Sequence, residues 1–250
     1  MLQRVGRFYV VRLKGGKQRA VFLVEEADTG QVAVLKQYTS GAEAVREYEV
    51  LHTCSGDPRI VSLIDFFEVE GLWCILTEYV DGVTLDALMA DRGALPPRKV
   101  IDLAIDILNG VAHVHAQGYI HGDLHGKNVM VTDFDRARVK IIDFQHAVRK
   151  LSTGKAAAIR RVERRRLAPE CKSGMIDERF DLYSVGYMCA CLLTGVVKLG
   201  KVPGNGSPRW WAGSHPLWKV IRKAMQPDPE QRYRTAQEMI AALEGLKSRS

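Results

Sequence analysis

The sequence predicts an α+β fold with two lobes, a small antiparallel β-rich N-terminal lobe containing one helix and a larger α-helical C-terminal lobe. Three observations lead to this prediction. Short runs rich in valine, leucine and aromatic residues recur through residues 8–80, which is typical of strands. One segment of helical periodicity interrupts them at residues 40–54. After Asp81 and Gly82 the apolar spacing becomes mostly helical.

Four strands are predicted in the first lobe. They are FYVVRL, RAVFLVEEA, QVAVLKQY and LWCILTEY. Turn residues separate the first three of these runs, as a glycine pair at 15–16 and the sequence DTG at 28–30. The lobes meet near residues 79–82, with no longer linker between them.

Helices are predicted in both lobes. In the N-terminal lobe, Ser40 can cap a helix in which Tyr48 and Leu51 recur at helical spacing. In the C-terminal lobe the clearest helical runs are residues 100–117, 181–194, 215–225 and 236–246.

The composition narrows the class of protein. A chain of 250 residues with 46% hydrophobic and 26% charged residues is long and apolar enough to form a core, which excludes disordered and fibrous classes. The net charge of +7 and a pI near 9.2 favour an anionic partner. Charge alone does not choose among nucleotide, phosphoprotein, nucleic acid and membrane surface.

The cysteines and the apolar runs predict the compartment. The five cysteines form neither a CxxC pair nor a disulfide framework, which favours a reducing setting. The N-terminal sequence lacks the apolar core of a signal peptide, and no uninterrupted apolar run reaches the ~18 residues of a membrane span. We therefore expect a soluble, cytoplasmic protein without a membrane span.

Two segments of the first lobe could bind phosphate groups. Lys36 lies on an apolar strand, and Glu47 lies on the following helix, where its carboxylate could hold the lysine ammonium in place. Upstream, Gly15 and Gly16 lie in LKGGKQRAVF, a strand–turn–strand whose backbone amides and lysines could cover a polyphosphate.

Three polar residues of the second lobe flank short apolar segments. Asp123 and Asn128 belong to HGDLHGKN, between a helical run and the strand-like VMVT, and Asp143 follows VKII. A few carboxylate oxygens mixed with a carboxamide suit Mg²⁺ that keeps waters and phosphate oxygens as its other ligands. A zinc site at HxDxH is disfavoured, because no third-ligand cluster accompanies it.

At this point the chain resembles a protein-kinase domain, specifically a eukaryotic-like serine/threonine kinase with an atypical catalytic loop. The family's ordered motifs are a Gly-rich loop, a strand lysine, a helix glutamate, HRDxxxxN, DFG and APE. They read here, in order, as LKGGKQRAVF, VLK, REYEVL, HGDLHGKN, DFQ and 168–170 (APE). DLYSVGYM with Asp181 resembles the central helix of the larger lobe, and DPEQRYRTAQEM with Arg232 resembles its closing helix. The resemblance covers nearly the whole chain, so we assign residues 1–250 to one domain with lobes of about 1–80 and 81–250.

The resemblance implies the roles of the site residues. Asp123 would orient the attacking hydroxyl, Lys36 and Glu47 would position the phosphates of ATP, and His125 stands where serine/threonine kinases carry a catalytic-loop lysine. Asn128 and Asp143 would hold Mg²⁺. The implied nucleotide-binding residues are Gly15, Gly16, Val21, Val34, Lys36, Thr77, Glu78, Val80 and Met130.

The departures from the family motifs leave two alternative functions open. HGDLH is similar to antibiotic, sugar and lipopolysaccharide kinases, which share the fold but phosphorylate small molecules. A poor Gly-rich loop, with Lys14 and Arg19 where glycines are expected, would suit a nucleotide-binding scaffold without activity.

Two further departures bear on regulation. Gly122 replaces the arginine that in family members commonly binds a phosphate on the activation loop, so activation by phosphorylation is not expected in the usual way. Gln145 replaces the DFG glycine, which should restrict the motif.

Basic residues near the APE motif and in the catalytic loop predict the charge of the substrate. Residues 160–166 (RRVERRR) carry five arginines just before the APE motif, with Glu163 and Arg166 where GTxxYxAPE has threonine and tyrosine. Lys127 stands where basophilic kinases carry an acidic residue. Both features favour a protein substrate that is acidic or otherwise anionic near its acceptor, with a small-molecule acceptor or a solvated basic loop as alternatives. Nothing beyond the basic charge indicates nucleic acid.

Overall fold

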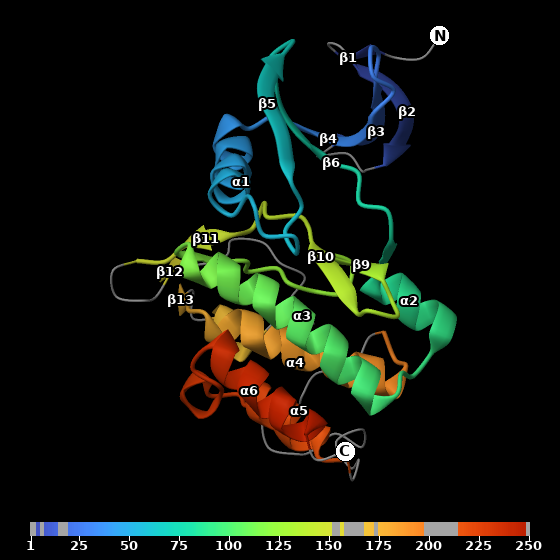
Figure 1. Cartoon of the computed structure of the whole chain (residues 1–250). Helices are drawn as coiled ribbons and strands as arrows, with labels where there is room; N and C mark the ends of the chain where they lie inside the picture. Colours follow the sequence, from blue (N-terminus) through green and yellow to red (C-terminus); the bar gives the residue numbers. More distant parts are fainter. Residues whose placement is uncertain are drawn as a thin grey trace.

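The computed structural model describes residues 4–5, 8–14, 20–151, 156–157, 168–172, 175–197 and 215–248. These residues form two lobes, one stacked on the other, with the β-sheet and α1 in the N-lobe and the remaining helices in the C-lobe (Figure 1). The predicted bilobal α+β fold is therefore confirmed. Among the described residues, every helix is too short or too polar to reach across a lipid bilayer.

The N-lobe is a six-stranded antiparallel sheet in the order β1-β2-β3-β4-β6-β5. Its strands are β1 (Arg4–Val5), β2 (Phe8–Lys14), β3 (Ala20–Glu26), β4 (Val32–Tyr38), β5 (Leu63–Val69) and β6 (Leu72–Glu78). Alternate residues of a strand face opposite sides of the sheet, so the two faces carry different side chains. Phe22, Val24 and Leu35 close one face in a small apolar core, while Lys36 and Tyr38 occupy the other.

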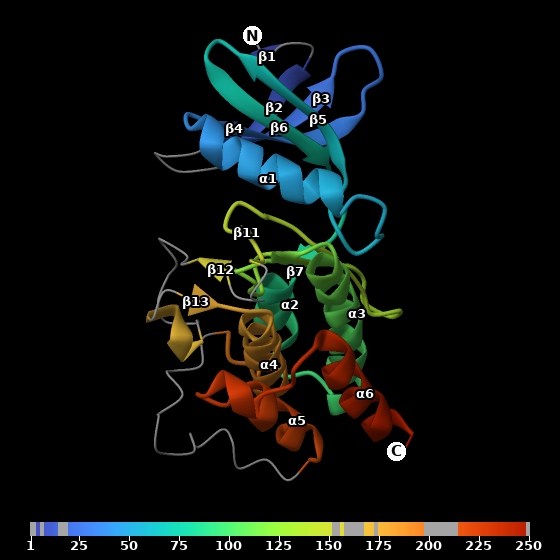
Figure 2. The same cartoon turned by 90° about the vertical axis from the view of Figure 1, so that its left-hand side faces the viewer.

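The helix α1 (Gly41–Thr53) follows β4 and packs on β4, β5 and β6 (Figure 2). The expected helix is confirmed, but its expected cap is wrong. Ser40 occupies the N-cap position without a side-chain capping bond, and only its carbonyl accepts from Ala44 N, at 3.2 Å. Tertiary contacts must therefore supply much of the stability of this helix.

The C-lobe contains the other helices and several short strands. The helices are α2 (Leu85–Arg92), α3 (Pro97–Ala116), α4 (Arg179–Thr194), α5 (Leu217–Ala224) and α6 (Ala236–Lys247). The strands are β7 (Val83–Thr84), β8 (Tyr119–Ile120), β9 (Val129–Asp133), β10 (Arg138–Ile141), β11 (Val148–Arg149), β12 (Ala156–Ala157) and β13 (Met175–Ile176). The four predicted helical runs are confirmed to within a few residues. Arg232, however, follows a short 3₁₀ turn (Pro229–Gln231) and precedes the closing helix α6 rather than lying within it.

The elements that were not predicted from sequence include the helix α2 and the strand β5. The helix α2 has only eight residues, too few to show helical periodicity clearly, although Thr84 caps it by accepting from Ala87 N at 3.2 Å. In β5 the charged Asp65 and Glu68 interrupt the apolar run LIDFFEV. The strand β5 is held by pairing with β6 and by packing on α1, whereas α2 packs on β7 and on the later strand β9.

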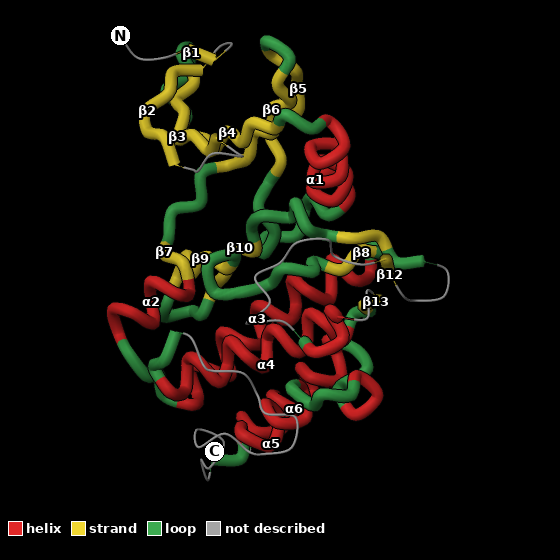
Figure 3. Tube along the Cα trace, turned by 180° about the vertical axis from the view of Figure 1, so that it is seen from behind, coloured by secondary structure: helices red, strands yellow, loops and turns green. Residues whose placement is uncertain are grey.

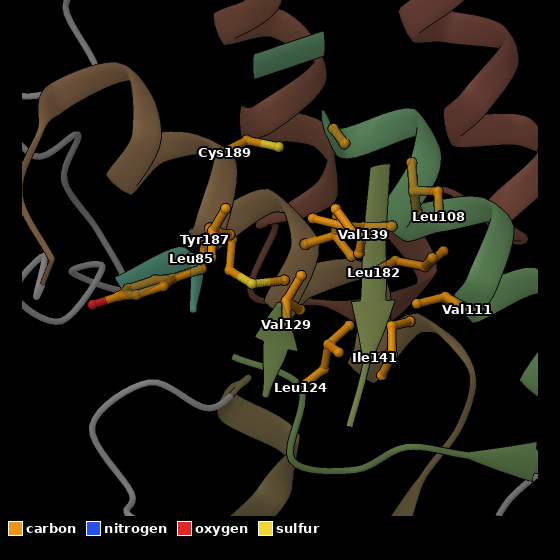
Figure 4. Packing of buried hydrophobic residues seen from close by; sticks show 14 of the residues in the cluster. Leu85, Leu108, Val111, Leu124, Val129, Val139, Ile141, Leu182, Tyr187 and Cys189 are labelled. Atoms are coloured by element: carbon orange, nitrogen blue, oxygen red, sulfur yellow. The ribbon is translucent and has the colours of Figure 1, made fainter. Parts of the chain in front are cut away.

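The C-lobe core supports the segment between β8 and β9. Side chains from α3, α4, β9 and β10 point toward one another there, as Figure 4 shows for Leu108, Leu182, Val129 and Ile141. A connection after β6 joins the lobes (Figure 3). A second link is made by Ile141, whose amide donates to the Arg59 carbonyl at 2.7 Å and whose carbonyl accepts from Val61 N at 3.1 Å.

Candidate active site

A lysine and two carboxylates meet between the lobes. Lys36 Nζ lies 2.6 Å from Glu47 Oε1 on α1 and 3.0 Å from Asp143 Oδ1, which follows β10. Burial alone would lower the pKa of Lys36, but the charges and hydrogen bonds of Glu47 and Asp143 outweigh it and raise this pKa above its ordinary value. The result is a permanently charged ammonium fixed between two elements that are far apart in sequence.

Both oxygens of the Glu47 carboxylate have donors. Oε1 accepts from Lys36 and from Phe144 N at 3.2 Å, and Oε2 accepts from the hydroxyl of Tyr38. Glu47 and Tyr38 are 0% and 1% exposed, so these bonds are shielded from water. Sequence reasoning missed Tyr38. The available signal was its position two residues after Lys36, which puts it on the same face of β4.

The segment His121–Asn128 forms a loop held from below by Asp181 of α4. The fully buried Asp181 carboxylate accepts from His121 N at 2.8 Å and Gly122 N at 3.0 Å, and His115 Nε2 lies 2.8 Å away. Burial raises the pKa of Asp181, but these hydrogen bonds and nearby histidines outweigh it and hold the pKa below its ordinary value. An ionised Asp181 therefore fixes the start of the loop.

Gly122 has a backbone requirement of its own. Its φ of 75° lies in the left-handed region that favours glycine. His121 is buried beside it and uses both ring nitrogens, with Nδ1 3.3 Å from Asp123 N and Nε2 3.3 Å from the Ile142 carbonyl. Burial lowers the pKa of His121 despite the carboxylates around it, so the ring is a neutral support.

The loop brings Asp123, His125 and Asn128 together. Asn128 Nδ2 donates to the Asp123 carbonyl at 3.0 Å, and His125 Nε2 lies 3.7 Å from Asp123 Oδ2. Asp123 and His125 are half-buried, whereas Asn128 is buried. The loop therefore presents a partly exposed carboxylate with an imidazole beside it, which can orient a hydroxyl and accept its proton.

Asn128 and Asp143 also suit a divalent cation. The Asn128 amide group donates to the loop, so its carbonyl oxygen is the atom left for other partners. Its backbone carbonyl accepts from Ile142 N at 2.9 Å, which ties it to the chain just before Asp143. Asp143 has a φ of 66°, a left-handed conformation that aspartate tolerates better than most residues. One carboxylate and one carboxamide oxygen are donors that Mg²⁺ accepts alongside phosphate oxygens.

Several residues expected to bind nucleotide share one face of the N-lobe sheet. The antiparallel register pairs Val21 with Lys36 and Val34 with Thr77, so all four side chains face the same side. Met130 is half-buried on β9 of the C-lobe. Gly15 and Gly16, and the arginines of residues 160–166, lie outside the described residues.

The segment between the lobes is anchored through Glu78. Its amide donates to the Ser62 carbonyl at 3.0 Å. Its side chain accepts from Ser62 N at 2.7 Å and from Lys140 Nζ at 2.6 Å. Val80, which is also among the implied nucleotide-binding residues, is 9% exposed.

Glu170 and Arg232 form a bidentate ion pair beneath the site. The two guanidinium nitrogens lie 2.6 and 2.7 Å from the carboxylate oxygens, and the Arg232 side chain is 0% exposed. This pair ties the segment before α4 to the segment before α6, which places the two motifs recognised in the sequence in direct contact. Lys127, next to Asn128, is exposed.

Comparison with known proteins gives a consistent result. The family profile described as "Protein kinase domain" matches residues 11–243. Serine/threonine-protein kinase PrkC of Bacillus subtilis is 28% identical over 266 residues, covering 94% of this chain and 40% of that protein. A probable serine/threonine-protein kinase of Clostridium perfringens is 31% identical over 241 residues, covering 86% and 34%. PknB of Mycolicibacterium smegmatis is 33% identical over 209 residues, covering 74% and 33%. The chain thus spans two fifths or less of the length of these curated relatives.

Proposed function

The chain belongs to the protein kinase family, and from this premise we propose that it is an ATP- and Mg²⁺-dependent serine/threonine protein kinase. The observation that carries the proposal is the contact of Lys36 with both Glu47 and Asp143, close to the loop that carries Asp123 and Asn128. A protein that only bound nucleotide would need the residues that hold phosphates and Mg²⁺, but not Asp123, whose proposed role is to accept the proton of the substrate hydroxyl.

The residues fit the demands of phosphoryl transfer. The reaction breaks the bond between the γ-phosphorus and the bridging oxygen of ADP and forms a bond to a substrate hydroxyl, whose proton passes to Asp123. Lys36 binds phosphate oxygens with a charge that Glu47 keeps in position. Asn128 and Asp143 would hold Mg²⁺, which when bound would neutralise negative charge on the phosphates. The protein therefore acts by placing charges rather than by forming a covalent intermediate.

His125 lies beside the reacting groups and takes the position of the family's catalytic-loop lysine. With Nε2 3.7 Å from Asp123 Oδ2, the ring can donate to a phosphate oxygen while remaining next to the carboxylate. For adenine, the Glu78 carbonyl and the Val80 backbone are the proposed polar partners, with Val21, Val34, Thr77 and Met130 as the surrounding side chains.

Two observations favour a protein substrate over a small-molecule acceptor. The pair of Glu170 with Arg232, and the support of the catalytic loop by Asp181, correspond to motifs of the protein-kinase branch that small-molecule kinases usually lack. The relatives reported above are also named serine/threonine-protein kinases. HGDLH remains the feature that favours the small-molecule alternative.

The substrate is proposed to be anionic near its acceptor. The support is the exposed Lys127 beside the catalytic loop, together with the five arginines at 160–166 in the sequence. Charges that bind the substrate beside its acceptor would act on docking rather than on the transferred group, so reversing residues 164–166 to glutamate should raise KM for an acidic protein much more than it lowers kcat. The KM of the wild type should also rise with salt. Equal KM values for acidic and basic proteins, insensitive to both changes, would contradict the proposal.

The decisive experiment measures transfer of labelled phosphate from Mg²⁺·ATP to acidic proteins, basic proteins, and a panel of alcohols and sugars. We expect label on acidic protein, and none with Asp123→Ala, which should still bind nucleotide. Asp143→Ala should weaken Mg²⁺-dependent nucleotide binding as well, as measured by calorimetry. Label only on a small molecule would establish the alternative kinase class, and nucleotide binding without transfer would establish a scaffold.

A further inference from the structure

A tyrosine completes the coordination of the α1 glutamate. Tyr38 and Lys36 lie on the same face of β4, and the Tyr38 hydroxyl donates to Glu47 Oε2 while Lys36 binds Oε1. The tyrosine ring is packed in the main core with Ala44 and Leu51 of α1, so its hydroxyl has a fixed direction. Lys36 also binds Asp143, whereas the Tyr38 hydroxyl donates to the glutamate oxygen that Lys36 does not contact.

We propose that Tyr38 is a positioning residue that holds α1 with Glu47 turned toward Lys36, so that the active arrangement is set within the N-lobe itself. The inference rests on the proposed kinase function and adds its regulation: turnover should not depend on a phosphate in the segment between Asp143 and the APE motif. Tyr38 is proposed as a positioning residue rather than a catalytic one, because its proposed effect on the reaction passes through Glu47.

The rest of α1 shows why an internal anchor matters. The helix lacks a side-chain cap at Ser40, so packing must hold it. On its outer side, the Tyr48 ring stacks on Phe66 of β5 at 4.5 Å between centroids, and Phe66 stacks on Trp73 of β6 at 5.4 Å. These ring contacts fix the position of the helix on the sheet. Tyr38 then fixes the direction of the one carboxylate that the site uses.

The catalytic loop contains no residue that could transmit a phosphate signal in the usual way. Gly122 replaces the arginine expected at its position, and its backbone serves Asp181 instead. A chain that lacks this arginine needs another means of keeping Glu47 inward. The bond from β4 provides it through two side chains only 9 residues apart in sequence.

The size of the effect follows from the type of bond. A hydrogen bond to a charged acceptor typically changes an equilibrium by about ten- to a hundredfold. Removing the hydroxyl leaves a buried carboxylate oxygen without its donor, and this favours states in which α1 moves so that Glu47 reaches water. The fraction of competent molecules, and with it kcat, should fall by up to the same factor.

The test compares Tyr38→Phe with Tyr233→Phe, which removes the hydroxyl of another buried tyrosine far from α1. ADP release from Mg²⁺·ATP gives kcat and KM, and hydrogen exchange of residues 41–53 reports the state of α1, with α6 as internal reference. We expect Tyr38→Phe to lower kcat about ten- to a hundredfold and to speed exchange in α1 alone. Tyr233→Phe should change neither. In a Glu47→Gln background, Tyr38→Phe should have less than about a twofold further effect, because the two residues act as one unit.

The outcomes separate the inference from the function on which it rests. A kcat within twofold of wild type together with unchanged exchange in α1 would overturn the positioning role, and equal effects of both tyrosine variants would assign Tyr38 to general stability. Phosphatase treatment of the wild type, or replacement of Ser152 and Thr153 by alanine, should leave kcat unchanged. A large loss of kcat would refute the claim that the N-lobe positions Glu47 without a phosphate. If the wild type transfers no phosphate while α1 still responds to Tyr38→Phe, the kinase proposal fails and the positioning role stands.

Discussion

Replacing Arg232 by methionine should lower the free energy of unfolding by about 3–5 kcal/mol. Methionine keeps much of the apolar volume but removes every donor of a fully buried guanidinium. Besides the two bonds to Glu170, that group donates to the carbonyls of Gln226 at 2.7 Å, Arg179 at 3.2 Å and Pro227 at 3.2 Å. The variant therefore leaves a carboxylate and three carbonyls without these donors.

The magnitude follows from the burial of the remaining partner. Breaking a buried ion pair by removing one member typically costs about 3–5 kcal/mol, because the other charge stays uncompensated. The Glu170 side chain is 12% exposed, so some water can reach it and the loss should fall toward the lower end of that range. In a chain of 250 residues, where 1 kcal/mol shifts Tm by about 2–4 °C, this corresponds to a Tm lower by about 6–12 °C for a loss near 3 kcal/mol.

The assay is urea unfolding followed by circular dichroism, with a thermal scan as a second measurement. Arg98→Met is the matched control, because it makes the same substitution at an exposed arginine. The ion pair of Arg98 with Asp102 is long, at 3.7 Å, so this variant should lower the free energy of unfolding by less than about 1 kcal/mol. Glu170→Gln should be milder than Arg232→Met, because the guanidinium keeps its three carbonyl acceptors. If Arg232→Met costs no more than Arg98→Met, the claim that this pair stabilises the C-lobe is refuted.

Three further predictions concern the site. Lys36→Met should keep the fold and lower turnover by ~10²-fold or more, as measured by ADP release, because a preorganised charge is lost. Burial raises the pKa of Glu78, but the bonds from Lys140 and Ser62 outweigh it and hold this pKa below its ordinary value. The stabilisation by Lys140 is therefore present above the ordinary pKa of a glutamate and is lost as the pH falls through the lowered pKa of the folded state, in the acidic range. The difference in urea midpoint between wild type and Lys140→Met should therefore shrink in that acidic range, and a constant difference would contradict the assignment. Gly126→Ala would place a Cβ 2.0 Å from Asp86 Oδ1, so kcat should fall and exchange in the catalytic loop should rise, whereas unchanged kinetics would show that the loop adapts freely.

Much of the architecture could be read from local patterns. Alternating apolar residues in QVAVLKQY predict a strand with two different faces, and the structure confirms that Leu35 is buried on one face while Lys36 reaches the site on the other. The helix that carries Glu47 was likewise visible from its spacing. Such features depend on neighbours within a few positions, so a linear pattern contains them. The cap expected at Ser40 was wrong because a residue type that can cap does not have to bond when packing already fixes the helix.

The order of the motifs determined the fold and the candidate residues, but the partners of those residues were decided by tertiary structure. Tyr38 looked like an ordinary strand residue until α1 brought Glu47 to its hydroxyl. Lys140 meets Glu78 across 62 positions, and Arg232 meets Glu170 across the same separation. Residue type and periodicity report which faces become buried, whereas the choice of a partner depends on the distances and angles at which helices and strands from remote parts of the chain finally pack. That geometry brings an ammonium, a tyrosine hydroxyl and two carboxylates together, because charged and polar groups withdrawn from water are stable when they are paired or hydrogen-bonded.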